Sequence, residues 1–235
     1  MKNLYVKAMR VARSMARATG LLDRLERSEN VDARWIRSQF AIYDSADLAS
    51  LDLPWWTYGA IDEVEKRLAA LQGRARVFEY GAGASTLWLA KRSAEVASVE
   101  HDVGFAASMQ DLFARHANIS LAVVPDAPAK GHAGEARSKR KGYEHRAFDA
   151  YVASIAARQG QFDLIVIDGR ARNACLAAAL ERLAPDGVIL FDNSDRSEYR
   201  QAIEGSGLVE RRLAGRAPAL PISSQTSILS RTTAQ

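Results

Sequence analysis

Four carboxylates end apolar runs of this sequence, at places where packing alone would not need a charge. Glu79 and Glu100 end two early runs, and Asp168 and Asp192 end two later ones. The carboxyl ends of parallel strands meet along one edge of a sheet, where ligands of open α/β sheets bind. Carboxylates gathered at such an edge attract a cationic ligand and repel a pyrophosphate. The pattern therefore predicts a site for a cationic small molecule, with room for a metal cation.

A glycine-rich turn follows the first of these acids. Gly81 and Gly83 allow the backbone to turn and to approach a ligand closely, and Ser85 is placed to cap the next helix. The third glycine of the dinucleotide-binding pattern is missing, because Thr86 stands in its place. This departure argues against a nicotinamide dinucleotide. A simple strand-to-helix turn is the alternative to a ligand-binding loop.

The elements that must position these residues alternate regularly along the chain. Apolar, strand-like runs stand at residues 76–80, 96–100, 119–124, 162–168 and 188–192. Helix-like stretches lie between them, at residues 85–93, 104–117, 143–158 and 171–183. The alternation predicts an α/β fold with a doubly wound, mostly parallel sheet covered on both faces. A last pair of runs, 208–214 and 225–229, predicts an antiparallel C-terminal hairpin, which would complete a seven-stranded sheet.

The glycine turn and its flanks, FEYGAGASTLWLA, resemble the first motif of the class I S-adenosylmethionine-dependent methyltransferases. The resemblance extends over about residues 76–231. It implies the Rossmann-like methyltransferase fold and S-adenosylmethionine as the cofactor. On this resemblance, Glu79, Gly81, Gly83 and Ser85 are expected to bind the cofactor.

Two further strand ends match the same family. Glu100 stands nineteen residues after Gly81, where the family has an acid that accepts both ribose hydroxyls. A carboxylate can take two hydroxyl donors at once, which is the physical reason for an acid there. Asp126, followed by Ala127, is similar to the family's Asp-Ala near the adenine amino group. The resemblance therefore implies that Glu100 and Asp126 also bind the cofactor.

Asp168, Asp192 and Asn193 form a second constellation, at the ends of two neighbouring strands. Three hard oxygen ligands suit Mg²⁺ or a similar divalent cation, and the set resembles the cation-dependent O-methyltransferases of the catechol and caffeoyl-CoA type. In that group the metal holds substrate oxygens and aligns a hydroxyl for attack. Ala171 replaces the catechol-type lysine base, so a metal-free enzyme is the alternative. Asp168 would then be its catalytic-face acid, and Asp192 with Asn193 would cap a helix.

Arg170 and His145 join Asp168 as catalytic candidates. Arg170 stays protonated and is a poor base, but it can bind a carboxylate or phosphate with two hydrogen bonds. His145 lies in a basic insertion at about residues 128–158 and is the histidine best placed to accept a proton. The consecutive cations 139–141 of this insertion could attract an anionic small-molecule acceptor, or they could lie on a solvated loop.

Residues 1–60 are expected to form an N-terminal helical extension with an aromatic lid, before a methyltransferase domain at 61–235. In the lid, Tyr58 could donate to the cofactor's carboxylate, and Trp55 and Trp56 could wall its sulfonium. Alternatively, the tryptophan pair anchors the extension to the core. Residues 1–18 have the pattern of an amphipathic basic helix that could lie on an anionic membrane surface. A solvated or docking helix is the preferred interpretation, since its apolar residues are small.

The 235 residues carry a formal net charge of +4, which is unevenly distributed. Residues 1–40 sum to +5 and residues 130–146 to +4, so the remaining 178 residues sum to −5. The predicted core is therefore acidic, which argues against a nucleic-acid partner. The single cysteine, Cys175, excludes an internal disulfide and a multi-thiolate metal site. No apolar run approaches the roughly 18 residues of a membrane span, and a cytoplasmic protein is expected.

Together these features predict a methyltransferase that uses S-adenosylmethionine to methylate an oxygen of a small or modest-sized acceptor. No Asn/Asp-Pro-Pro-Tyr run follows residue 168, which argues against methylation of amino groups in adenine, cytosine or glutamine. Two alternatives stay open: a non-catalytic nucleotide-binding or membrane-docking protein on the same fold, and an aminopropyltransferase-like enzyme. The strand-end carboxylates oppose the first alternative, and the basic insertion opposes the second.

Overall fold

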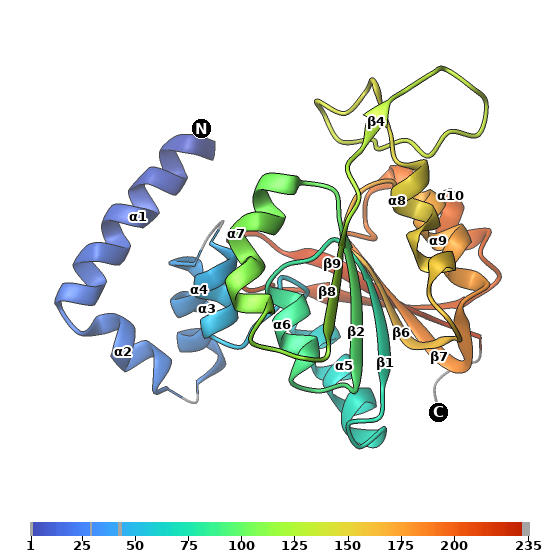
Figure 1. The fold of residues 1–235 in the computed structure, drawn as a ribbon. Coiled ribbons are helices and arrows are strands. Elements are labelled where there is room, and N and C mark those ends of the chain that lie inside the picture. Colours follow the sequence, from blue (N-terminus) through green and yellow to red (C-terminus); the bar gives the residue numbers. More distant parts are fainter. Residues whose placement is uncertain (1, 29, 42–43, 232–235) are drawn as a thin grey trace.

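A twisted seven-stranded sheet forms the centre of the part of the chain that the computed structural model describes, residues 2–28, 30–41 and 44–231 (Figure 1). The strand order is β3-β2-β1-β6-β7-β9-β8. The first five of these strands pair in parallel, and β9 and β8 add an antiparallel edge, which confirms the predicted fold class. The strands are β1 (Arg76–Tyr80), β2 (Glu95–Glu100), β3 (Ile119–Val123), β6 (Phe162–Ile167), β7 (Leu183–Asp192), β8 (Val209–Gly215) and β9 (Ser224–Ser230).

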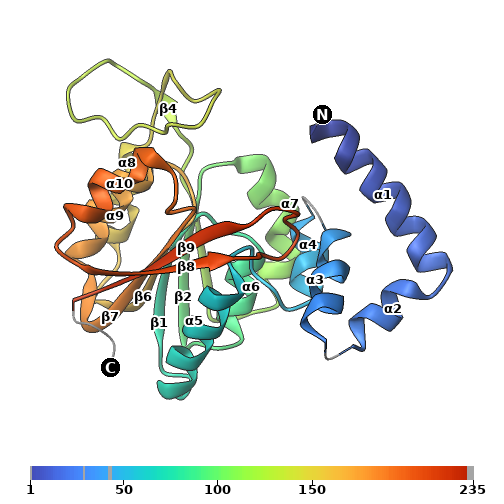
Figure 2. The same cartoon turned by 180° about the vertical axis from the view of Figure 1, so that it is seen from behind.

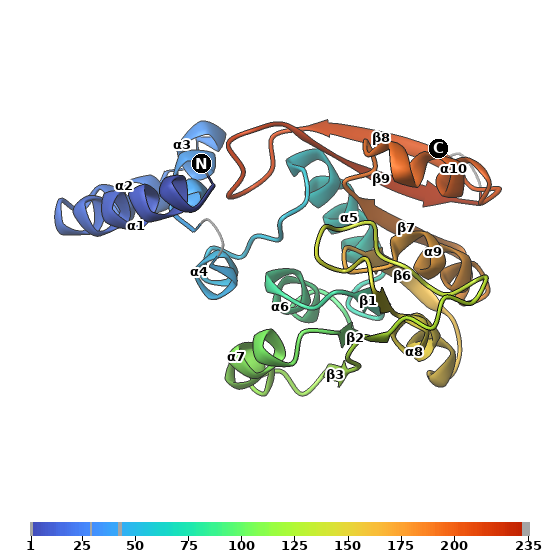
Figure 3. The same cartoon turned by 90° about the horizontal axis from the view of Figure 1, so that it is seen from above.

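Helices cover both faces of the sheet, as Figure 3 shows from above. One face carries α5 (Tyr58–Ala70), α6 (Ala84–Ala90) and α7 (Val103–Phe113). The other face carries α8 (Asp149–Ala153), α9 (Arg172–Leu180) and α10 (Ser197–Glu204). This arrangement brings the carboxyl ends of β1, β2, β6 and β7 to one edge, between the two helical layers.

The core consists of two main apolar clusters, one on each face of the sheet. Successive side chains of a strand point to opposite faces, so β1 contributes to both clusters. Val77 packs in the cluster that contains Trp56 and Val64, whereas Phe78 packs in the one that contains Phe162. Burial on both faces explains why the parallel strands read as continuous apolar runs in the sequence.

The N-terminal helices project to one side of the sheet domain (Figure 2). Arg13 ties α1 to the start of α4 through ion pairs to Asp44 and Asp47, at 3.0 and 2.7 Å. Val11 and Met15 of α1 are exposed. None of the described helices is both long and apolar enough to cross a membrane. The four helices are α1 (Lys2–Ala18), α2 (Leu21–Glu26), α3 (Val31–Gln39) and α4 (Ser45–Ser50).

The predicted helix over 143–158 is wrong in its first half. A short antiparallel pair, β4 (Ala127–Pro128) with β5 (Arg146–Ala147), occupies this part of the insertion. The helix begins only at α8, and a 3₁₀ helix, η1 (Ser154–Ala157), continues it. The pairing prevails because Arg146 is anchored to the Asp126 carboxylate and carbonyl, which holds its segment in an extended conformation.

Candidate functional site

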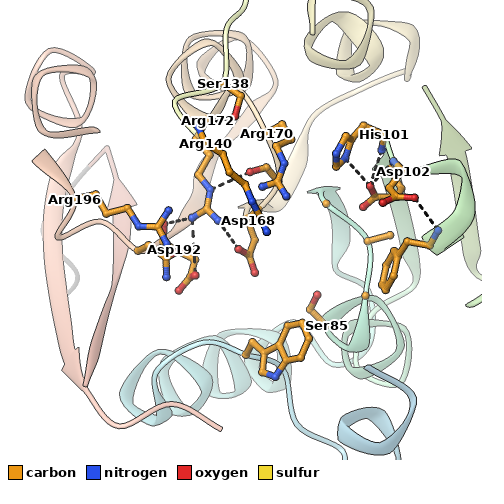
Figure 4. A pocket seen from close by; sticks show the side chains of 18 of the residues that line it. Ser85, His101, Asp102, Ser138, Arg140, Asp168, Arg170, Arg172, Asp192 and Arg196 are labelled. Carbon is orange, nitrogen blue, oxygen red and sulfur yellow. Dashed lines mark hydrogen bonds and ion pairs between the residues drawn. The ribbon is translucent and has the colours of Figure 1, made fainter. Parts of the chain in front are cut away.

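A cavity of about 800 Å³ opens at the carboxyl ends of β1, β2, β6 and β7. Figure 4 shows His101 and Asp102 at one end and Asp192 and Arg196 at the other, with Asp168 between them. We call this space the strand-end cavity. Its lining residues are Trp55, Gly81, Ala82, Gly83, Ala84, Ser85, Glu100, His101, Asp102, Phe105, Ser138, Lys139, Arg140, Asp168, Gly169, Arg170, Arg172, Asp192, Asn193, Arg196, Glu198, Tyr199, Ala219 and Leu220.

The floor of the cavity is a contact between two glycines on neighbouring strand ends. Gly81 has a φ of +97°, and a Cβ on it would lie 2.7 Å from the Gly169 Cα. A Cβ on Gly169 would lie 2.0 Å from the Tyr151 hydroxyl oxygen and 3.0 Å from the Tyr80 carbonyl oxygen. The two backbones can therefore meet only as glycines. Gly81 could be recognised from the sequence, whereas the only sequence signal of Gly169 is its place directly after a strand-end acid.

Gly83 leaves space at the mouth of the same loop. Its backbone is extended, with a φ of 174°, and a Cβ on it would meet no atom within 4 Å. Its N–H donates to Thr86 Oγ1 at 2.9 Å, which fixes the start of α6. Because Gly83 also lines the cavity, the missing side chain leaves a cradle beside the backbone where a ligand can approach closely.

Glu79 does not line the cavity, which corrects its assignment as a cofactor contact. It is fully buried beneath the loop and accepts hydrogen bonds from Ser85, Thr86 and Ser98 at 2.5, 2.6 and 2.7 Å. Ser85 lines the cavity, but its hydroxyl serves Glu79, and Gly83 stands at the helix N-cap position instead. Glu79 is therefore a brace that holds the glycine loop in shape.

Burial raises the pKa of Glu79 from 4.5 to about 7, and the charge of Asp168 adds to the effect. The Glu79 carboxyl therefore stays protonated in the folded chain at pH values where it has lost its proton in the unfolded chain. The contribution of Glu79 to the free energy of unfolding should be largest below about pH 4.5 and fall as the pH rises to about 7. A loss on the order of 3 kcal/mol corresponds to this shift. Urea unfolding from pH 4.5 to 8 should show a flatter profile for Glu79→Gln than for the wild type. Parallel profiles would contradict the raised pKa.

Glu100 lies at the other side of the glycine loop, at the end of β2. Its side chain lines the cavity and is nearly buried. Oε1 accepts the backbone N–H groups of His101 and Asp102, both at 2.7 Å. Among the described residues, no hydrogen bond to Oε2 is found, so this oxygen can accept hydroxyl donors from a ligand. The backbone bonds fix the carboxylate in place before any ligand arrives.

His101 connects this end of the cavity to the insertion. Its Nδ1 lies 2.6 Å from Glu100 Oε1, and its Nε2 lies 3.2 Å from the Tyr143 hydroxyl. The Tyr143 ring in turn lies under the Arg170 guanidinium, at 5.2 Å from Cζ to the ring centroid. His145, by contrast, is exposed and lies outside the cavity lining. It directly precedes β5, and its carbonyl accepts the Ala129 N–H next to the β4–β5 pair. The candidate proton acceptor of the insertion is therefore misplaced.

Asp126 and Tyr58 also lie outside the cavity lining. The Asp126 carboxylate is paired with Arg146, which draws it toward the insertion and away from the cofactor end. Tyr58 begins α5, and its side chain packs against the core, which explains why it does not reach the strand ends. Of the two tryptophans in the proposed lid, Trp55 lines the cavity, whereas Trp56 is fully buried against Trp88, with ring centroids 5.8 Å apart.

Asp168 and Asp192 meet at the far end of the cavity with Arg172 between them (Figure 4). The Arg172 side chain is 6% exposed and donates to Asp168 Oδ1 at 2.7 Å. It also donates to three carbonyl oxygens, those of Asp168, Gly169 and Asp192. Its Nη1 lies 3.9 Å from Asp192 Oδ2, and burial raises the pKa of Asp192 to about 7.

This arrangement does not fit the predicted divalent cation. Asp168, Asp192 and Asn193 do line one cavity, as the strand order requires. However, the guanidinium of Arg172 takes the place between the carboxylates, and a cation next to it would face strong repulsion. Over the residues that the structure describes, no group of three His, Cys, Asp or Glu side chains could hold a metal ion. The sequence alone did not reveal this role of Arg172.

Comparison with known proteins identifies the family. A family model described as a methyltransferase domain matches residues 78–194. No curated protein matches the sequence. A candidate O-methyltransferase from Klebsiella pneumoniae, of known structure, is 18% identical with a TM-score of 0.53, and the match covers 94% of this chain and 95% of that one. A spermidine synthase in complex with the transition state analogue AdoDATO is 11% identical with a TM-score of 0.50, over 77% of this chain and 60% of that one.

The two structural likenesses show the shared fold, and the domain match covers most of the residues that line the cavity. It includes the glycine loop and all four strand-end acids from Glu79 to Asp192. The chain belongs to the class I S-adenosylmethionine-dependent methyltransferases.

Proposed function

We propose that this methyltransferase transfers the methyl group to an oxygen of a small acceptor that binds beside Asp168. The observation that carries the proposal is the undivided strand-end cavity. It runs from the glycine loop and Glu100 to Asp168 and Asp192, so a cofactor and an acceptor can share one cavity. Alignment of the two and exclusion of water are what methyl transfer asks of a protein, because the sulfonium is already activated.

The residues at the first end of the cavity fit S-adenosylmethionine. Glu100 offers a fixed carboxylate with Oε2 open to hydroxyl donors, and the bare Gly83 backbone leaves room beside it. The net negative balance of this end also suits a cationic cofactor. When bound, S-adenosylmethionine supplies a methyl carbon for an acceptor oxygen to attack, and the electrons of the broken C–S bond stay on sulfur.

Asp168 is the group best placed to receive the proton that the acceptor hydroxyl loses. Arg172 holds its Oδ1 at 2.7 Å, and no described residue donates to Oδ2. The fixed orientation aims the second oxygen at the cavity, which Asp168 lines. The description of the Klebsiella pneumoniae protein as a candidate O-methyltransferase supports oxygen as the attacked atom.

Binding and transfer test this function separately. Calorimetric titration should show that the purified protein binds S-adenosylmethionine, and cofactor labelled with ¹³C in its methyl group should give O-methyl resonances in small-molecule products. Asp168→Asn keeps an oxygen for Arg172 but removes the base, so it should lower kcat about 100-fold or more with little change in cofactor affinity. Label found only on nitrogen or carbon would reject oxygen as the acceptor atom.

The geometry around Arg172 predicts that turnover does not need a divalent cation. Because a guanidinium stands between Asp168 and Asp192, we expect methyl transfer to keep its rate in excess chelator. Addition of Mg²⁺ or Mn²⁺ should not raise the rate. The measurement is the initial rate of transfer before and after chelator treatment. Loss of turnover that Mg²⁺ restores would mean that Arg172 moves away from the two carboxylates in the working enzyme.

A further inference from the structure

We propose that the acceptor carries an anionic group, a carboxylate or a phosphate, which binds to Arg170 and Arg196 on the basic wall of the strand-end cavity. The inference rests on the proposed function, since it names the chemical class of the molecule that shares the cavity with the cofactor. It follows from the way that charge is distributed and paired along the cavity wall.

Acidic and basic side chains lie on different parts of the cavity wall. The β2 end contributes two acids, Glu100 and Asp102, beside the glycine loop. The opposite wall contributes five cations, from the ends of β6 and β7 and from the insertion, and Figure 4 labels the four arginines among them. The five cations are Lys139, Arg140, Arg170, Arg172 and Arg196. A ligand that spans the cavity therefore meets an acidic surface at one end and a basic surface at the other.

The pairing of these cations is unequal. Each nitrogen of the Arg172 guanidinium already has an acceptor, because the group donates to the Asp168 carboxylate and to three backbone carbonyls. Arg170 forms no ion pair within the described parts of the chain, and its Nε is buried with no acceptor. Arg196 is exposed to the cavity, and its guanidinium has neither a hydrogen bond nor an ion pair to any residue that the structure describes. Arg92 and Arg200 show the contrast, since each holds a carboxylate at 2.7 Å.

The acids on the same wall do not cancel this charge. Asp168 and Asp192 are held by Arg172, and the raised pKa of Asp192 lowers its negative charge near neutral pH. Glu198, in the first turn of α10, also lines the wall and balances one cation. Arg170 and Arg196 together still leave this wall positive.

Guanidinium groups select the ligand chemistry. The planar fork of an arginine matches a carboxylate or a phosphate, with two parallel hydrogen bonds to each. A buried N–H without an acceptor, such as Arg170 Nε, is unfavourable until a ligand oxygen satisfies it. The Tyr143 ring packs against the Arg170 guanidinium in a cation–π contact, which keeps the guanidinium at the cavity wall. A cationic acceptor, as an aminopropyltransferase would use, would be repelled here.

Fractionation of natural acceptors by charge tests the proposal. A deproteinised extract of the source cells is separated on a strong anion exchanger into bound anions and unbound neutral or cationic molecules. Each fraction is then incubated with the protein and methyl-labelled S-adenosylmethionine. We expect label in the anion fraction. Arg170→Gln and Arg196→Gln should each raise KM for that acceptor at least tenfold, with the cofactor Kd unchanged. The matched control is Arg115→Gln, at an exposed arginine outside the cavity, which should change neither value.

Three results separate the outcomes. Label in the anion fraction, with the KM effects confined to the two cavity arginines, supports the anion site. Label in the unbound fraction overturns the anion site but leaves the proposed methyl transfer intact. Cofactor binding without label in either fraction overturns the proposed small-molecule transfer, and the anion site with it. Arg170→Lys and Arg196→Lys check folding and charge together, because they keep the charge but lose the fork and should recover KM only in part.

Discussion

Glu100→Ala is expected to weaken S-adenosylmethionine binding roughly 100-fold, because it removes the carboxylate that we propose as the acceptor for two ribose hydroxyls. Hydrogen bonds to a charged group contribute about 1.5 kcal/mol or more each, so the pair should account for about 3 kcal/mol. The carboxylate is already fixed by two backbone N–H groups at 2.7 Å, so little ordering is needed when the ligand binds. Calorimetric titration with the cofactor or with S-adenosylhomocysteine measures the effect.

Two further variants separate the loss of ligand contacts from damage to the loop. Glu100→Gln keeps one carbonyl oxygen for the backbone N–H groups, so it should fold normally and still lose most of the affinity. Glu95→Gln changes the opposite end of the same strand, where Glu95 pairs with Arg76 at 2.9 Å, and should leave affinity unchanged. Equal affinities for the wild type and Glu100→Ala would show that the ribose site lies elsewhere.

Gly81→Ala is expected to lower stability and Gly83→Ala to lower cofactor affinity, although the two glycines are separated by only one residue. A Cβ at Gly81 would collide with the Gly169 backbone, and φ at this position is +97°. The strain and the overpacking together should lower the free energy of unfolding by about 3 kcal/mol or more. A Cβ at Gly83 would meet nothing within 4 Å. Gly83→Ala should therefore change stability by about 1 kcal/mol or less, yet weaken cofactor binding about tenfold or more by filling the cradle.

Urea unfolding and calorimetric titration of both variants form one experiment. The expected pattern is a stability loss for Gly81→Ala and an affinity loss at near-native stability for Gly83→Ala. If Gly83→Ala bound the cofactor as the wild type does, the space beside this residue would not be part of the binding site. If Gly81→Ala were as stable as the wild type, the β1 and β6 ends would be able to separate without cost.

The strands could be predicted because each buried parallel strand has its own local signature, a short apolar run closed by glycine or acid. β1 was found at its true bounds, residues 76–80. β7 was placed at 188–192 but begins at Leu183, since Leu183 pairs with Phe162 across a register shift that no local pattern encodes. The prediction of a helix over 143–158 was wrong in its first half for a related reason. The pairing of Arg146 with Asp126 is a contact between residues far apart in sequence, and it outweighs local helical periodicity.

The site was predictable where strand topology alone decides position. Gly81, Gly83, Glu100, Asp168 and Asp192 all line the cavity because parallel strand ends must meet. The direction in which a side chain points was harder to predict, because it depends on which hydrogen-bonding partners lie nearby in the folded chain. Glu79 sits at a strand end, but three hydroxyl donors hold it beneath the loop.

Other residues that were misplaced or missed lie outside the strand ends. Tyr58 and His145 lie on segments whose path depends on long-range contacts, and neither lines the cavity. Arg172 was overlooked as a functional group, since its role exists only when two strand-end acids are brought beside it. Arg196 was missed because no motif marks it. Both arginines become visible only in the assembled cavity.

The position of Arg172 also bears on how the site is made in the cell. A positive charge that is part of the chain arrives at Asp168 and Asp192 when the chain folds, whereas a metal must be drawn from the cellular pool and loaded. Assembly of this end of the cavity is therefore complete at the moment of folding. We therefore expect this end of the cavity to form without a metallochaperone or a metal transporter, and to be insensitive to metal starvation.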